Sequence, residues 1–128
     1  MKEVIYCFLS ENGTDISRAR GASMINQCHG TSVLNKKEYP EYYWALDEHL
    51  ARSFVNLCYQ ERCPIIGIDI IVQKNGKYSL SFDVWCYQRK DCEDDDCFLV
   101  NSIKGAIKYI NYFSKKDNLY SFTLEDCK

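Results

Sequence analysis

The chain lacks any long hydrophobic run. No uninterrupted apolar stretch approaches the roughly 18 residues that a transmembrane helix needs. The apolar run at residues 4–9 is also too short for the hydrophobic region of a signal peptide. We therefore expect a cytoplasmic protein with no membrane partner. Reduced thiols are the default in the cytoplasm, so the eight cysteines do not imply a disulfide framework.

Motifs of catalysis and cofactor binding are missing as well. The chain has no P-loop, no glycine-rich dinucleotide fingerprint, no Gly-x-Ser-x-Gly and no His-Glu-x-x-His. Its two histidines are His29, adjacent to Cys28, and His49. Neighbours in sequence rarely align as nucleophile and base. We predict no catalytic residue, no cofactor and no enzymatic activity, with a small enzyme built around Cys28 and His29 as an alternative.

The chain also lacks a strong charge of one sign. Its net charge is −2, so no global basic field attracts nucleic acid, and we expect no direct nucleic-acid partner. With 128 residues, of which 46% are hydrophobic and 27% charged, the composition is that of a globular protein. This length suits one domain over residues 1–128.

The hydrophobic pattern alternates between strand and helix periods. It predicts a strand at residues 2–9, a short helix at 14–27, a loop at 28–39, a helix at 40–60, a hairpin at 65–87, a helix at 97–114 and a strand at 119–124. A tight central hairpin forces antiparallel pairing. The predicted fold class is therefore α+β, a single domain with a mainly antiparallel sheet of about four strands and two main helices packed on it.

The register of the predicted hairpin depends on the length of its turn. A two-residue turn would pair Val72 with Ser79 and mix apolar with polar side chains. A three-residue loop over residues 74–76 opposes Val72 to Tyr78 instead. One residue of slip exchanges the two faces of a strand, so burial favours the three-residue loop, with Gly76 left-handed in a bulge.

A dense acidic run follows the hairpin. Residues 91–97 contain Asp91, Glu93, Asp94, Asp95 and Asp96. Some of these carboxylates suit the start of the following helix, where caps and the helix dipole favour negative charge. A calcium loop would need a glycine in its middle, which is absent, so no metal site is predicted. The third interpretation is an electrostatic surface for a basic protein partner, which would raise association rate and selectivity.

Two aromatic residues lead into this run. Trp85 and Tyr87 alternate with the apolar residues of their strand, which places them on its more polar face. Aromatic anchors beside a charged rim are typical of a protein-binding hot spot. We predict that the partner-binding residues are Trp85, Tyr87, Asp91, Glu93, Asp94, Asp95 and Asp96.

The cysteines offer a competing interpretation. Cys58 and Cys63 have four residues between them, as do Cys92 and Cys97, which is within the range of zinc-ligand pairs. A cysteine-ligated metal-binding or redox regulatory protein is therefore the alternative function. Buried free thiols explain three of the cysteines more simply, because Cys7, Cys58 and Cys86 each fall in an apolar pattern.

The segment Trp85-Cys86-Tyr87, followed by Asp91-Cys92-Glu93-Asp94-Asp95-Asp96, resembles the binding surface of a bacterial immunity protein. More narrowly, the acidic α+β character of the chain resembles immunity proteins of contact-dependent growth inhibition systems. The resemblance implies a cytoplasmic antitoxin, expected to be monomeric, whose partner is a cognate toxin domain. Such toxins are often nucleases, so the resemblance further implies a basic nuclease whose active site the immunity protein occludes. The alternative geometry is binding at a distant surface of the toxin, which blocks the toxin's own partner.

Overall fold

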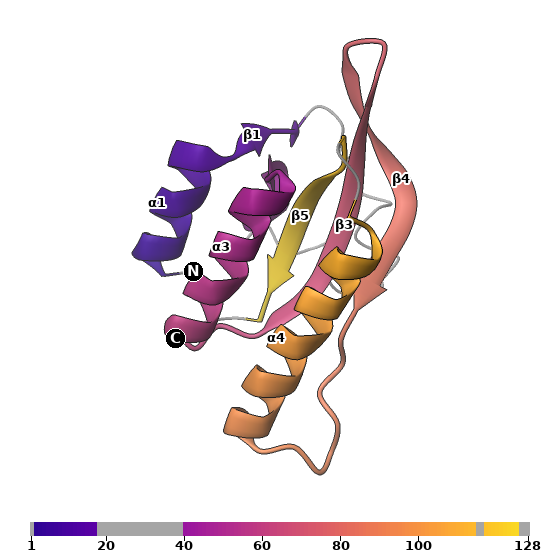
Figure 1. Cartoon of the computed structure of the whole chain (residues 1–128). Helices are drawn as coiled ribbons and strands as arrows, with labels where there is room; N and C mark the ends of the chain where they lie inside the picture. Colours follow the sequence, from indigo (N-terminus) through magenta and orange to yellow (C-terminus); the bar gives the residue numbers. More distant parts are fainter. Residues whose placement is uncertain (1, 18–39, 115–116, 126–128) are drawn as a thin grey trace.

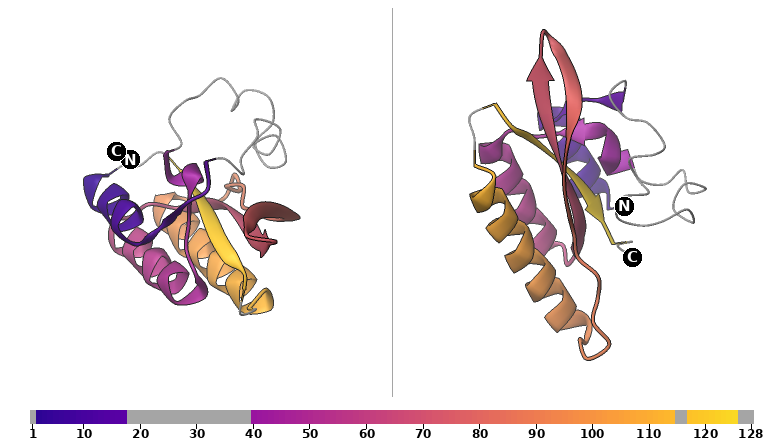
Figure 2. Two further views of the ribbon diagram at one scale, coloured as in Figure 1. Left: turned by 90° about the horizontal axis from the view of Figure 1, so that it is seen from above. Right: turned by 90° about the vertical axis from the view of Figure 1, so that its right-hand side faces the viewer.

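A three-stranded antiparallel sheet in the order β4-β3-β5 organises the chain. The computed structural model describes residues 2–17, 40–114 and 117–125 (Figure 1). Its elements are α1 (Glu3–Asn12), β1 (Thr14–Asp15), the 3-10 helix η4 (Pro40–Tyr43), β2 (Trp44–Ala45), α3 (Glu48–Gln60), β3 (Ile65–Lys74), β4 (Lys77–Cys86), α4 (Asp95–Tyr112) and β5 (Leu119–Leu124). Helices α3 and α4 cover one face of the sheet, and α1 lies beside α3 (Figure 2).

This is the predicted α+β fold, and its two main helices are α3 and α4. The main sheet has three strands where about four were expected. The difference arises at residues 2–9, which form most of α1 and not a strand. In α1, Ile5 and Leu9 are buried four residues apart, whereas Val4 and Tyr6 are 46% and 43% exposed. A short apolar run does not distinguish a strand from a helix, and here the helical period prevails.

The helix predicted over 40–60 ends where expected but begins later. Pro40 opens the short η4, and β2 then pairs with β1, so that Thr14 faces Ala45. Helix α3 begins only after Asp47, whose carboxylate accepts a hydrogen bond from the Leu50 amide at 2.8 Å. A capping aspartate therefore sets the helix start, and not the proline. The helix predicted at 14–27 is wrong at its start, because Thr14 and Asp15 form β1. Its remainder from residue 18 and the loop predicted at 28–39 lie outside the described residues.

The hairpin is confirmed, but its predicted register near the turn is wrong. Val72 pairs with Ser79 across a two-residue turn of Asn75 and Gly76. Both turn residues have positive φ, 52° and 77°, as the favoured type I′ hairpin turn requires. An irregularity between Asp69 and Ile71 then shifts the pairing. Turn chemistry therefore sets the local register, and the irregularity changes which residues lie opposite each other further along.

The shift places Trp85 opposite Ile68, toward the helices. The Trp85 ring packs against the main core, and it lies so close to α4 that a Cβ built on Gly105 would be 2.7 Å from its Cζ2 atom. Near the turn, Tyr78 and Leu80 instead pack with Ile71 in a second, smaller cluster. The two ends of β4 thus contribute apolar side chains to different clusters.

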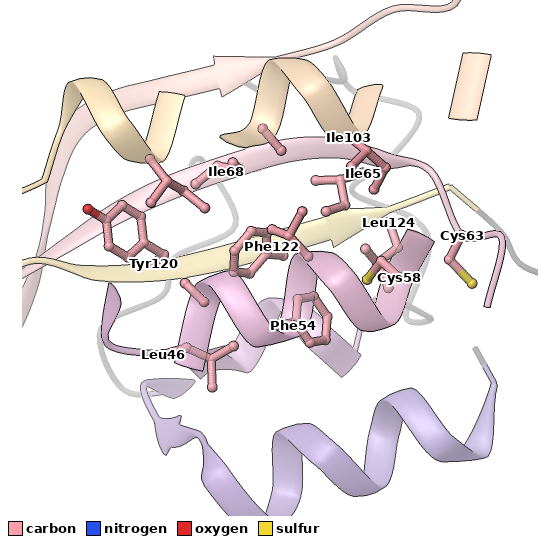
Figure 3. Packing of buried hydrophobic residues seen from close by; sticks show 14 of the residues in the cluster. Leu46, Phe54, Cys58, Cys63, Ile65, Ile68, Ile103, Tyr120, Phe122 and Leu124 are labelled. Atoms are coloured by element: carbon pink, nitrogen blue, oxygen red, sulfur yellow. The ribbon is translucent and has the colours of Figure 1, made fainter. Parts of the chain in front are cut away.

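The main core lies between the sheet and the helices (Figure 3). Phe54 of α3 and Phe122 of β5 have ring centroids 4.9 Å apart. Tyr120 is fully buried and donates its hydroxyl proton to the Phe113 carbonyl at 2.9 Å. The backbone of Tyr120 also pairs with Leu46, which attaches the segment before α3 to the free edge of β5. These contacts join β5, α3 and the end of α4.

The cysteines differ from expectation in part. Cys58 is a buried free thiol, as predicted. Cys7 is free but exposed, and Cys86 is exposed and disulfide-bonded, so both predictions of a buried free thiol are wrong. Cys63 is disulfide-bonded as well. The default of reduced thiols therefore does not hold for Cys63 and Cys86.

The contact between Gly105 and Trp85 can be tested by substituting Gly105 with and without the Trp85 ring present, because the effect on stability should change sign. We expect Gly105→Ala to lower the free energy of unfolding by about 1–2 kcal/mol, because overpacking outweighs the gain in helix propensity. In a Trp85→Leu background the same change should raise it by about 1 kcal/mol, since the added methyl group then meets no ring. Urea denaturation of the four proteins measures both effects. If Gly105→Ala changed the free energy of unfolding in the same direction in both backgrounds, the close packing of Trp85 against Gly105 would be contradicted.

Candidate protein-binding site

The acidic run forms the connection between β4 and α4 and the first turn of α4 (Figure 1). Four of its carboxylates are exposed, those of Asp91, Asp94, Asp95 and Asp96. We call these four residues the acidic corner. The fifth carboxylate, that of Glu93, behaves differently, because this residue is only 7% exposed. The predicted set of five carboxylates therefore divides into a surface group and one internal member.

Glu93 is held by hydrogen bonds from three directions. Its Oε2 atom accepts from the Tyr87 hydroxyl and from Asn101 Nδ2, both at 2.6 Å. Its Oε1 atom accepts from the backbone amide of Lys90 at 2.7 Å. These donors favour the ionised form, the Tyr87 bond most strongly, and lower the pKa of Glu93 to about 2. Burial, followed by the bond to this carboxylate, raises the pKa of Tyr87 to about 12.

Arg89, an exposed residue, joins the loop to the first turn of α4. Its Nε and Nη2 atoms donate to the Glu93 carbonyl at 3.1 and 3.0 Å, and its Nη1 atom donates to Asp95 at 2.8 Å. The guanidinium also lies over the Phe98 ring, 5.2 Å from its centroid. The Tyr87 ring stacks on Phe98 with a centroid distance of 6.0 Å. The loop before α4, which carries Asp91, is therefore attached to this helix by charged and aromatic contacts together.

The exposed carboxylates make contacts of their own. Asp94 caps α4 by accepting from the Cys97 amide at 2.8 Å, and this bond lowers the pKa of Asp94. Asp96 pairs with Arg62, which follows the end of α3. The prediction that part of the run serves the helix start is thus confirmed. Because exposed ion pairs are worth only about 0–1 kcal/mol, the carboxylates of Asp95 and Asp96 can still exchange partners.

The two aromatic residues do not lie where the sequence pattern suggested. Trp85 and Tyr87 are partly buried beneath α4, with ring centroids 6.1 Å apart. The Trp85 ring also lies 6.3 Å from that of Tyr109. Their expected position on an exposed polar face is wrong, because the two-residue turn pairs even-numbered residues of β3 with odd-numbered residues of β4. The irregularity between Asp69 and Ile71 keeps this parity, so Trp85 shares the face of Ile68. Their contact with a partner stays a prediction.

The sequence pattern did not point to Arg89 or Asn101 as members of this site. Asn101 is a solvent-side residue of α4 by its position, and only the path of the β4–α4 connection brings its amide to Glu93. Arg89 carried no signal beyond its nearness to the acidic run. Both residues act by holding Glu93 and the loop backbone in place.

The described residues do not favour the cysteine-ligated alternative. Cys63, one of its four proposed ligands, is disulfide-bonded. Burial raises the pKa of the Cys58 thiol, and the hydrogen bond to Asp94 raises that of Cys97, so both thiolates are disfavoured. Within residues 2–17, 40–114 and 117–125, no group of three or more His, Cys, Asp or Glu side chains could hold a metal ion.

The histidines add no nucleophile–base pair to the described part of the chain. His49 lies exposed on α3, as expected for a residue that flanks the apolar stripe. Cys28 and His29 lie outside the described residues. No helix in the part of the chain that the structure describes is long and apolar enough to cross a membrane.

The carboxylate of Glu93 should make the stability of the folded protein depend on pH in the acid range. The pKa of Glu93 is about 2 in the folded state and 4.5 ordinarily, so between these values the unfolded chain binds more protons. Stability should therefore fall as the pH drops from about 4.5 to about 2. We expect Glu93→Gln to be less stable than wild type at pH 7, and the difference to shrink across this window. Thermal unfolding measured by circular dichroism from pH 7 to pH 2 checks it.

The matched control is Glu11→Gln, which alters an exposed glutamate on α1. It should keep the wild-type dependence of stability on pH. If Glu93→Gln kept that dependence too, the bonds to the Glu93 carboxylate would not be what stabilises the folded loop.

The comparison with protein families finds a match over most of the chain. The model of the family Immunity protein 40 matches residues 33–124, which include the hairpin, the acidic corner, α4 and β5. No curated protein and no solved structure matches the chain. The family match covers most of the chain, and it agrees with the resemblance to immunity proteins seen in the sequence. The chain belongs to the Immunity protein 40 family.

Proposed function

We propose that this immunity protein neutralises a nuclease toxin of a contact-dependent growth inhibition system by covering the toxin's active site with its acidic corner. Membership of the family implies a cognate toxin protein as the partner. A nuclease presents cationic groups to the phosphates of its substrate. Carboxylates presented in their place would bind the same groups. In this proposal the protein is a cytoplasmic monomer that has no enzymatic activity and does not itself bind nucleic acid.

The observation that carries this proposal is the fixed presentation of the exposed carboxylates. Asp94, Asp95 and Asp96 occupy the cap and first turn of α4, and Glu93 attaches the preceding loop to the same helix. A surface held in its bound geometry loses little conformational entropy on association. Charge complementarity of this kind also steers encounter and suppresses wrong partners.

Nearby cations reduce the negative charge without removing it. Arg62 and Arg89 pair with Asp96 and Asp95, and Lys90 lies in the loop. In the proposed complex, cationic side chains of the toxin share or replace these surface pairs. Asp91 is exposed and adds a further carboxylate at the edge of the corner.

A charge reversal at the corner tests the proposal. The variant is Asp91→Lys, Asp95→Lys and Asp96→Lys; Asp94 is kept, because removing this cap would cost about 1 kcal/mol of stability. We expect the variant to bind the toxin more than tenfold more weakly and with a smaller dependence on salt. The probe is the C-terminal domain of the exported protein encoded by the neighbouring reading frame. Calorimetry at several salt concentrations measures both quantities, and nuclease assays measure inhibition.

The control reverses three exposed carboxylates elsewhere, in Glu3→Lys, Glu11→Lys and Asp117→Lys. It changes the net charge of the protein by the same amount, so it separates the local effect from the global one. If the corner variant and this control bound the toxin with equal affinity, the acidic corner would not be part of the interface.

A further inference from the structure

A groove runs between α3 and α4 on the side of these helices that faces solvent. Its volume is about 360 Å³. From α3 it is lined by Arg52, Val55, Asn56 and Tyr59, which recur every three or four residues and so share one helix face. From α4 the apolar lining comes from Val100, Ile103 and Ile107, beside Lys104. The two helices run side by side in front of the sheet (Figure 1).

The walls of the groove combine apolar surface with positive charge. Tyr59 is 48% exposed and Ile107 is 39% exposed, so both present apolar surface to solvent beside the groove. The Arg52 side chain is 41% exposed; it pairs with Glu48 at 3.2 Å and donates to Asn111 at 2.7 Å. Lys104 is exposed as well. Tyrosine and arginine around an apolar centre are typical of the residues that dominate protein interfaces.

The groove continues directly from the acidic corner. Asp96, Val100 and Lys104 succeed one another every four residues along α4, so they lie on one face of this helix. Across the groove, Arg62 follows the end of α3 and pairs with Asp96. The surface therefore changes along one line from negative at the start of α4 to apolar and positive further along.

Interface size argues that a partner bound at the corner also reaches the groove. A stable protein complex buries about 800 Å² on each partner, contributed by roughly 20–30 residues. The acidic corner supplies four residues, so it is only the edge of such an area. The groove is the adjoining surface that offers apolar side chains for burial.

We infer that the groove is the second half of the toxin-binding surface, and that it receives a toxin segment with an apolar anchor flanked by carboxylates. This inference rests on the proposed function, because the occupant is the same toxin domain. A carboxylate of the segment pairs with Lys104, a second one shares the Arg52 guanidinium with Glu48, and the apolar anchor packs between Val55 and Ile103. The cationic groups of the toxin meet the acidic corner. Opposite charges at the two ends of the surface fix the orientation of the complex.

Two single substitutions test the groove. Tyr59→Ala removes an exposed ring from its wall, and Lys104→Glu reverses the charge beside it. We expect each to weaken binding of the same toxin domain at least tenfold. The substituted side chains are exposed, so the thermal unfolding of both variants should stay close to that of wild type. Calorimetric titration of the purified proteins measures the affinity.

The matched controls are Tyr6→Ala on α1, where the tyrosine is 43% exposed, and Lys77→Glu at the turn of the hairpin. Both should bind the toxin as wild type does. If wild type binds and all four variants bind equally, the groove is not part of the interface, while the proposed function stands. If wild type itself does not bind, the proposed function fails and this inference fails with it.

Self-association is measured first, by light scattering of the eluted proteins. A wild type that is dimeric, and that becomes monomeric on Tyr59→Ala, would show that the groove is occupied by a second copy of the chain. That result would overturn the assignment of the groove to the toxin.

Discussion

The buried carboxylate of Glu93 is the contact on which the rest of the site depends. Burying a charge is costly unless hydrogen bonds replace the lost water. Here they come from the end of the β4 segment through Tyr87, from the loop backbone through Lys90, and from α4 through Asn101. One ionised group thereby joins three segments that differ in sequence position and structure. Because Glu93 holds the loop against α4, the exposed carboxylates of the acidic corner have a defined position.

This arrangement separates the residues that position the surface from the residues that form it. Tyr87, Glu93 and Asn101 hold the loop, whereas Asp91, Asp95 and Asp96 are the groups that face solvent. A binding surface supported in this way can change its exposed side chains at little cost to folding. Substitution of a supporting residue should instead affect stability and binding together, because it leaves a buried polar group without its partner.

The sequence predicts the long patterned elements well and the short ones poorly. The hairpin, α3 from Asp47 onward, α4 and β5 were all predicted from their periods. Burial follows the period in the two helices, whereas β3 and β5 are buried along most of their length. The run at residues 4–9 is too short to show one, and its helix was predicted as a strand. The hairpin register depended on a type I′ turn at Asn75 and Gly76 and on an irregularity near Asp69, and side-chain alternation indicates neither.

For the candidate site, the acidic run was recognisable as a surface feature, but its internal division was not. Five neighbouring acidic residues look alike in sequence. Only the three-dimensional path of the loop makes Glu93 an internal residue, because it brings Asn101 from two turns along α4. The same reasoning applies to Trp85 and Tyr87: a strand pattern assigns them to a face, but the pairing between β3 and β4 decides toward what that face is turned.

Helix α4 carries both halves of the proposed binding surface, so its placement controls their relative position. The helix is fixed at its first turns by the Glu93 cluster and in its middle by the close approach of Gly105 to Trp85. At its C-terminal end, the Phe113 carbonyl accepts hydrogen bonds from the Tyr120 hydroxyl and from Asn118 Nδ2, both at 2.9 Å. A rigid helix set at three points cannot shift the corner without also shifting the groove. Residues that lie beneath the helix, Trp85 among them, therefore determine the spacing that a cognate toxin would have to match.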